Sequence, residues 1–328
     1  MKIYSRGFNL FGEITEPILN HFTLVVEFEV IKKVCLNFSY SIFHTDKECF
    51  LYVHEGVIDL VKAFEGDVLM VGSNDDFYLF MKDTGELLLG DLNHLQESIQ
   101  THYENHFPDK TIKDIVCGSK IIVIYGTDGT VCKVIDSVPQ TLKFKCNNIV
   151  DVKCGNEHCL ILDEIGNVYS FGVGSRGQLG HGKLNEEPEP VLIEALAGIK
   201  IKKIAAGGWH SCAISEDGVL YAWGWNCNGQ IGLGKTEEED GYVAVMAQPH
   251  VVEFSNEDLN ALYVACGARH TIVYTDDKQL YGCGWNKYHQ LKTCDDKNIF
   301  KLTHLHNFED YSVLDLQCGP WSSAAICE

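Results

Sequence analysis

The chain has 328 residues, of which 45% are hydrophobic and 22% charged, and its formal net charge is -20. An acidic surface repels phosphate backbones, which argues against direct nucleic-acid binding and favours a basic protein partner such as a histone-like segment. The longest apolar run, residues 22–31, contains two glutamates and is far shorter than the roughly 20 residues of a membrane span. No membrane association is therefore expected.

The chain contains fourteen cysteines, and their redox state is predicted from the N-terminal sequence. The N-terminus has no apolar signal segment, so the thiols are expected to be reduced, in the nucleus or also in the cytoplasm. No Cys-x-x-Cys pair occurs, which argues against a zinc site. We expect most of these thiols to be buried.

The chain is built from repeats, and it begins with half of one. Residues 4–14, YSRGFNLFGEI, match YAWGWNCNGQI at 221–231. Three weak copies follow at 34–47, 70–85 and 116–129. The position that later holds histidine is filled in these copies by Ser39, Asp75 and Ile121.

Three strong copies follow at 153–180, 205–232 and 265–292. They share Gly-x-x-His, an apolar run, an acidic turn, a second apolar run and a Gly-Gln-Leu-like ending. The last copy, 317–328, stops halfway through a unit whose missing half is at the N-terminus. The spacing gives seven units in a chain that closes on itself.

Each unit predicts a four-stranded antiparallel meander. In one unit, 201–205, 210–215 and 219–224 are apolar strands, and Asp217-Gly218 is a hairpin signal. Seven such sheets bury their faces when they pack radially. The prediction is an all-β, seven-bladed β-propeller, one domain over 1–328, closed by pairing of the terminal half-blades, residues 2–6 with 322–327.

These motifs resemble the regulator of chromosome condensation repeat family. The resemblance is strong over 149–328 and 1–16 and degenerate over 17–148. Within the family, AAGGWHS at 205–211 and CGPW at 318–321 are similar to a small single-propeller nuclear member. That member partners a JmjC-domain oxygenase involved in histone lysine demethylation and chromosome segregation.

The resemblance implies a non-enzymatic, chromatin-associated scaffold: a monomeric propeller in a hetero-complex with a JmjC-domain oxygenase. An alternative is guanine-nucleotide exchange on a Ran-type small GTPase, the activity of the founding member, but the sequence offers no device that displaces phosphate and magnesium. A generic adaptor, for example in ubiquitin transfer, is a third reading.

No catalytic residue, metal or cofactor is predicted. Residues 229–236, GQIGLGKT, match a phosphate-binding loop, but four acidic residues follow where a helix N-terminus is needed. Residues 172–177 imitate a dinucleotide fingerprint, although no helix follows. His44 and Asp46 have the His-x-Asp spacing of an iron oxygenase site, but they fall on the expected acidic turn of a repeat, which argues against an iron site. The repeated histidines are spread around the ring, so we expect polar loop contacts rather than a metal site: His158, His210 and His270.

One end of the propeller is the candidate binding face. In a meander, the loop between the first two strands and the loop between the last two emerge at the same end. Variable positions of the first loop hold Trp209, Arg269 and Trp321, and the second loops begin with Trp225 and Trp285. Tryptophan and arginine are enriched in interface hot spots, although a Trp in Trp-Gly-x-Asn often packs between blades.

An acidic loop is a second candidate partner site. It is a run of four residues in the longest gap between repeat glycines: Glu237, Glu238, Glu239 and Asp240. Such runs are commonly plain solvated loops.

Overall fold

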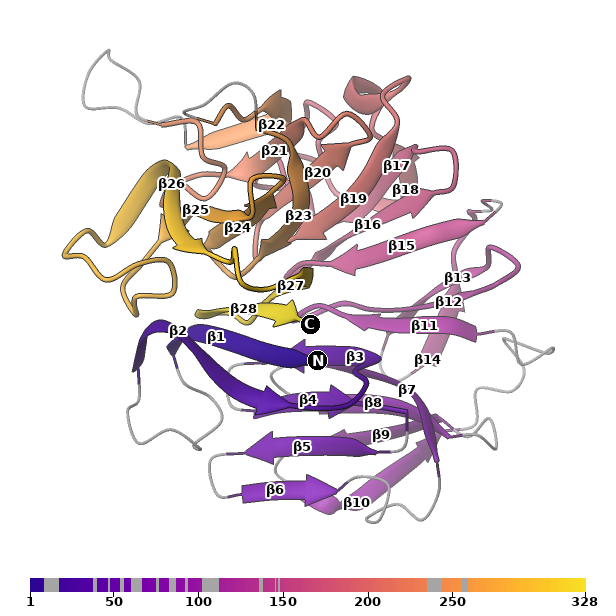
Figure 1. Ribbon diagram of the computed structural model, residues 1–328. Coiled ribbons are helices and arrows are strands. Elements are labelled where there is room, and N and C mark those ends of the chain that lie inside the picture. The colour runs from indigo at the N-terminus through magenta and orange to yellow at the C-terminus, as the bar shows by residue number, and fades with distance from the viewer. Residues whose placement is uncertain are drawn as a thin grey trace.

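The computed structural model describes residues 1–8, 18–37, 40–46, 48–53, 56–59, 67–74, 77–82, 87–91, 94–101, 112–135, 138–144, 146, 148–234, 244–254 and 259–328. These residues form seven four-stranded antiparallel sheets, arranged around a central axis (Figure 1). One short 3-10 helix, η1 (Glu194–Leu196), is the only helix within the described ranges. The predicted all-β propeller architecture is confirmed.

Three sheets come from the N-terminal half, each a meander in chain order. The first is β3 (Lys33–Leu36), β4 (Tyr40–His44), β5 (Cys49–Val53) and β6 (Gly56–Asp59). The second is β7 (Val68–Ser73), β8 (Phe77–Lys82), β9 (Leu87–Asp91) and β10 (His94–Thr101). The third is β11 (Ile112–Cys117), β12 (Ile122–Gly126), β13 (Val131–Ile135) and β14 (Val138–Thr141).

Three further meanders contain the strong repeats. They are β15 (Ile149–Cys154), β16 (His158–Asp163), β17 (Val168–Gly172) and β18 (Glu187–Leu192); β19 (Ile201–Ala206), β20 (His210–Ser215), β21 (Leu220–Trp225) and β22 (Val245–Val251); and β23 (Ala261–Cys266), β24 (His270–Thr275), β25 (Gln279–Trp285) and β26 (Asn298–Asn307).

The seventh sheet is shared by the two ends of the chain, which lie side by side (Figure 1). Its order is β2-β1-β28-β27, from β1 (Lys2–Phe8), β2 (Ile18–Glu27), β27 (Val313–Cys318) and β28 (Ser322–Cys327). Lys2 pairs with Cys327 and Gly7 with Ser322, which confirms the predicted pairing of the terminal strands.

The fourth strand of the shared sheet lies inside the stretch where the repeat motif is weak. β2 pairs with β1 as far as Glu27 opposite Lys2. The fourth strand of the terminal unit therefore extends past residue 17. A side-chain contact fastens the other end of β1, where the buried Arg6 donates from Nε to the carbonyl of His289 at 2.7 Å.

The core lies between the sheets. The inner strands are β3, β7, β11, β15, β19, β23 and β27; each contacts the next in this order, and β27 contacts β3. The second strands of the strong units are buried along their whole length, because both faces of the sheet pack on neighbours: β16, β20, β24 and β28. One apolar cluster, for example, joins Cys212 and Ile214 of β20 to Val264 and Val273.

We predict that deleting residues 1–8 destabilises the protein by several kcal/mol. The deletion removes a strand hydrogen-bonded on both sides, exposes the edge of β28 and detaches β2. Thermal unfolding of the full chain and the truncated chain measures the effect. Melting temperatures within about a degree of each other would show that the shared sheet does not hold the ring together.

Candidate partner-binding face

The Gly-x-x-His motif requires glycine at its first position because the backbone there packs closely against the histidine ring. A Cβ on Gly155, Gly207 or Gly267 would collide with the imidazole of the histidine three residues later in the same loop. A Cβ on Gly207 would also lie 2.6 Å from the carbonyl oxygen of Gly267, in the next unit. The glycine therefore lets the loop close over a buried ring and approach its neighbour.

Each buried histidine bonds a hydroxyl of the next sheet. His158 Nε2 lies 2.9 Å from Ser211 Oγ, and Ser211 Oγ donates to the carbonyl of Gln178 at 2.9 Å. In the second example His210 bonds the hydroxyl of Thr271, which donates to the carbonyl of Gln230. In the third, His270 bonds the hydroxyl of Ser323, which donates to the carbonyl of Gln290. We call this histidine–hydroxyl–glutamine-carbonyl contact the latch. The predicted polar role of these histidines is confirmed, but the partner lies in the neighbouring sheet.

The latch fixes the tautomer of its histidine. The serine or threonine has one hydrogen and gives it to the glutamine carbonyl, so Nε2 must carry a proton and donate it to the hydroxyl oxygen. Nδ1 is then unprotonated, and it is buried without a hydrogen-bond partner in all three rings. Burial lowers the pKa of His158 and of His270 to about 3, so both rings are neutral at physiological pH.

The two loops at this end of the propeller are joined through their backbones. The Trp225 amide donates to the carbonyl of Trp209 at 2.8 Å, and the Trp285 amide donates to that of Arg269 at 2.8 Å. Gly224, at φ 103°, makes this approach possible, because a Cβ there would lie 2.6 Å from the oxygen of Trp209. The two sets of predicted residues are therefore adjacent.

The five residues predicted for this face form one continuous row. Trp209 and Trp225 meet edge to face, with ring centroids 5.4 Å apart. Arg269 lies over both Trp225 and Trp285, with its guanidinium carbon 5.2 Å and 5.8 Å from the ring centroids. Trp285 meets Trp321 at 5.9 Å. All five side chains are half-buried.

Two further residues belong to the row and were missed in the sequence. Arg176 places its guanidinium carbon 4.4 Å from the ring centroid of Trp209 and 4.6 Å from that of Trp225. Tyr288 stacks on Trp321 at 4.8 Å. Both residues stand two positions before the latch glutamine of their own unit, and this shared spacing was the available signal. We call the seven residues the band: Arg176, Trp209, Trp225, Arg269, Trp285, Tyr288 and Trp321.

The band borders the mouth of the central channel. A cavity of about 320 Å³ at the mouth is lined by Trp209, Trp321 and the glycines of five repeat loops, as predicted for the two tryptophans. Arg269 is not part of that lining and lies farther out, over its two indole rings. The buried tryptophan that packs between sheets is Trp223, whose indole N–H donates to the carbonyl of Gln178 at 2.9 Å.

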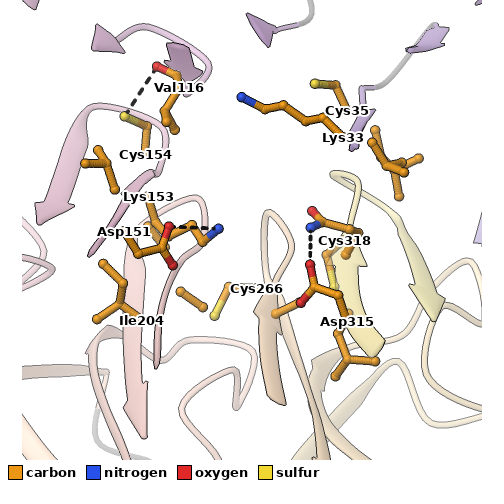
Figure 2. A pocket seen from close by; sticks show the side chains of 18 of the residues that line it. Lys33, Cys35, Val116, Asp151, Lys153, Cys154, Ile204, Cys266, Asp315 and Cys318 are labelled. Atoms are coloured by element: carbon orange, nitrogen blue, oxygen red, sulfur yellow. Dashed lines mark hydrogen bonds and ion pairs between the residues drawn. The ribbon is translucent and has the colours of Figure 1, made fainter. Parts of the chain in front are cut away.

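A second cavity of about 620 Å³ runs along the inner strands (Figure 2). Two of its lysines are paired with carboxylates: Lys33 lies 2.6 Å from Asp114, and Lys153 lies 3.3 Å from Asp151. Cysteine thiols also line it, and burial raises the pKa of Cys35, Cys117 and Cys318. These three thiols therefore stay protonated and are poor nucleophiles.

The two glycine-rich motifs form repeat turns wherever the structure describes them, whereas His44 is the buried last residue of β4. Gly229, Gly232 and Gly234 all have positive φ in successive turns, and no helix follows within the described part of the chain. Across the same residues, no group of three or more His, Cys, Asp or Glu side chains could hold a metal ion. The acidic loop, Glu237 to Asp240, lies outside the described residues.

Comparison with known proteins identifies the repeats. The model of the regulator of chromosome condensation (RCC1) repeat matches residues 166–214 and 217–274, and a second model of the same repeat matches 149–178, 201–230 and 263–290. The predicted RCC1 repeats are therefore confirmed over 149–290. No helix in the described residues is long and apolar enough to cross a membrane.

Two relatives and two solved structures illustrate the similarity. Human RCC1 domain-containing protein 1 is 37% identical over 205 residues, covering 52% of this chain and 54% of that protein. The ultraviolet-B receptor UVR8 of Arabidopsis thaliana is 40% identical over 146 residues, covering 44% and 31%. The chain thus spans about half, or less, of the length of these relatives.

The structures extend the likeness to the whole fold. Yeast RCC1 (Prp20), solved bound to Kap60, has a TM-score of 0.79 at 15% identity, covering 99% of this chain and 88% of that one. Human WBSCR16 has a TM-score of 0.75 at 14% identity, covering 100% and 98%. Together they show an RCC1-type propeller fold.

We predict that acid destabilises the protein through the latch. The pKa of His158 and of His270 is lower in the folded state than the ordinary 6.5 of the unfolded chain. Their stabilising contribution is complete above pH 6.5 and is lost as the pH falls from 6.5 towards 3. When the pH is lowered from 7 to 5, each ring should lower the free energy of unfolding by about 2 kcal/mol, because only the unfolded state gains the proton.

Urea unfolding at the two pH values tests this prediction. Replacing His158 or His270 with asparagine should remove about 2 kcal/mol of the pH dependence, whereas replacing the exposed His250 should leave it unchanged. An unchanged pH dependence in both latch variants would show that the buried rings are not the titrating groups.

Proposed function

We propose that this protein is a non-enzymatic scaffold that binds a protein partner through the band. The observation that carries the proposal is the continuous row of seven aromatic and arginine side chains on one face. Four of the five tryptophans of the chain lie in it, half-buried rather than in the core. Tryptophan, tyrosine and arginine are the residue types that dominate interface hot spots.

The scaffold is proposed to be a single domain over residues 1–328, a closed ring of seven blades. Support comes from the pairing of β1 with β28 and from the contact of β27 with both β23 and β3. A closed ring holds the loops of four neighbouring sheets in fixed relative positions. The band extends across those four sheets.

The proposed partner is a JmjC-domain oxygenase acting on histones, with the protein as a monomeric propeller in a nuclear, chromosome-associated complex. The sequence resemblance to a nuclear partner of such an enzyme supports this choice. The cavity at the mouth offers a concave surface to such a partner, and the band offers hot-spot residues beside it.

Guanine-nucleotide exchange on a Ran-type small GTPase is the second candidate. It is favoured by the fold of Prp20p, whose structure was reported with binding properties to Gsp1p and histones. At 16% identity that likeness supports the fold alone. Release of fluorescent GDP from a Ran-type GTPase, with and without this protein, decides between the two: catalytic acceleration would establish exchange and overturn the scaffold.

We predict that Trp209→Ala and Trp321→Ala each weaken partner binding by about 1–3 kcal/mol, the usual range for an aromatic hot spot. Both indole rings border the mouth and pack on other band residues rather than in the core, so melting temperatures should change little. Affinity capture from nuclear extract with mass spectrometry identifies the partner, and titration calorimetry of the purified pair measures the loss.

Ile165→Ala is the matched control. Ile165 is a large hydrophobic residue, 68% exposed, in the turn between β16 and β17 at the opposite end of the propeller. Its removal should leave partner binding unchanged. If the two tryptophan variants fold and still bind as well as the wild type, the docking surface is not the band.

A further inference from the structure

The band offers hydrogen-bond donors without acceptors. Within the described part of the chain, no carboxylate or carbonyl accepts from the guanidinium groups of Arg176 and Arg269. The indole N–H groups of Trp209, Trp225 and Trp285 likewise donate to no described residue. Contact with a ring face leaves the five N–H donors of a guanidinium available to a ligand.

Arginine is used sparingly in this protein. The chain has 26 basic residues, and three of them are arginines, at positions 6, 176 and 269. Arg6 is buried and fastens β1, so the other two arginines are both in the band. A guanidinium stacks on aromatic rings and binds carboxylates with two parallel hydrogen bonds, which a lysine ammonium cannot do.

We propose that the band binds an acidic segment of the partner protein, with carboxylates on alternate residues of an extended strand. This inference rests on the proposed function and adds the chemistry of the bound segment. It reverses the basic partner expected from the net charge of -20, because the band contains two arginines and no described carboxylate forms an ion pair with either of them. Glu157, which holds the position of Trp209 and Arg269 in the preceding unit, pairs with Lys120 at 3.3 Å.

The spacing of the arginines sets the spacing of the acids. Both guanidinium carbons face the same ring, at 4.6 Å and 5.2 Å from the centroid of Trp225. The two can be no farther apart than the sum of these distances. Alternate side chains of an extended strand lie on one side and about 7 Å apart. A Glu-x-Glu segment can therefore place one carboxylate on each arginine, with its backbone across the indole.

Fluorescence anisotropy with labelled peptides tests the proposal. The probe is a 12-residue peptide that alternates glutamate and leucine; matched peptides carry glutamine or lysine in place of glutamate. The full chain should bind the glutamate peptide at least ten times more tightly than the glutamine peptide. Equal binding of the two, or preference for the lysine peptide, would overturn the proposal.

Two arginine variants locate the binding. Arg176→Gln and Arg269→Gln should each weaken binding of the glutamate peptide about ten-fold, and Arg269→Lys should recover only part of it because the fork is lost. Lys200→Gln is the charge-matched control, since Lys200 pairs with Glu216 at the opposite end of the propeller, and it should bind normally. Retained binding in both glutamine variants, with unchanged melting temperature, would overturn the proposal.

The same variants separate this inference from the proposed function. If the purified partner binds Trp209→Ala more weakly but binds the arginine variants normally, the band is the docking surface. The proposal that it binds an acidic segment is then wrong. If neither set of variants affects the partner, the proposed function fails as well. Light scattering at micromolar concentration covers another occupant: a dimer that dissociates in the arginine variants would make a second copy of this chain the ligand and overturn the proposal.

Discussion

The latch between neighbouring sheets is the contact on which this face of the molecule depends. A neutral imidazole donates to a serine or threonine, which donates to a glutamine carbonyl, and the three groups come from two sheets. All are buried, so losing one partner would leave polar groups without water or protein contacts, at a cost of about 1–3 kcal/mol. The latch therefore fixes both the distance between sheets and the shape of both loops above it.

The band is confined to the sheets that carry the latch. Its residues stand one to five positions from latch residues in the sequence; Trp209, for example, precedes His210 and Arg269 precedes His270. In the sheets of the N-terminal half, asparagine makes the corresponding connection: Asn37 donates to Ser73, and Asn74 donates to the carbonyl of Gly118. The fold therefore persists without histidine there. Variable residues placed on a rigid, repeated frame are where a recognition surface can change without loss of the fold.

Much of this architecture could be predicted from the sequence because it is local and periodic. The strand pattern, the pairing of the two ends and the common end of the two loops follow from the period and from alternation. What the sequence did not reveal depends on contacts between units. Arg176 contacts an indole ring of the next sheet. The hydroxyls of Ser211 and Thr271 accept hydrogen bonds from histidines of the preceding sheet. A repeat alignment shows which positions are equivalent, but not which equivalent positions touch.

The net charge sums over the whole chain and does not describe the charge of any one face. On the band, stacking arginine over tryptophan solves two problems at once. The guanidinium covers part of an indole surface that would otherwise be exposed to water, which limits self-association of a large apolar patch. The neighbouring rings in turn restrict the long arginine side chain before any ligand arrives, so less conformational entropy is lost on binding. The band can thus be stable in water before a partner protein binds and still be organised to bind carboxylates.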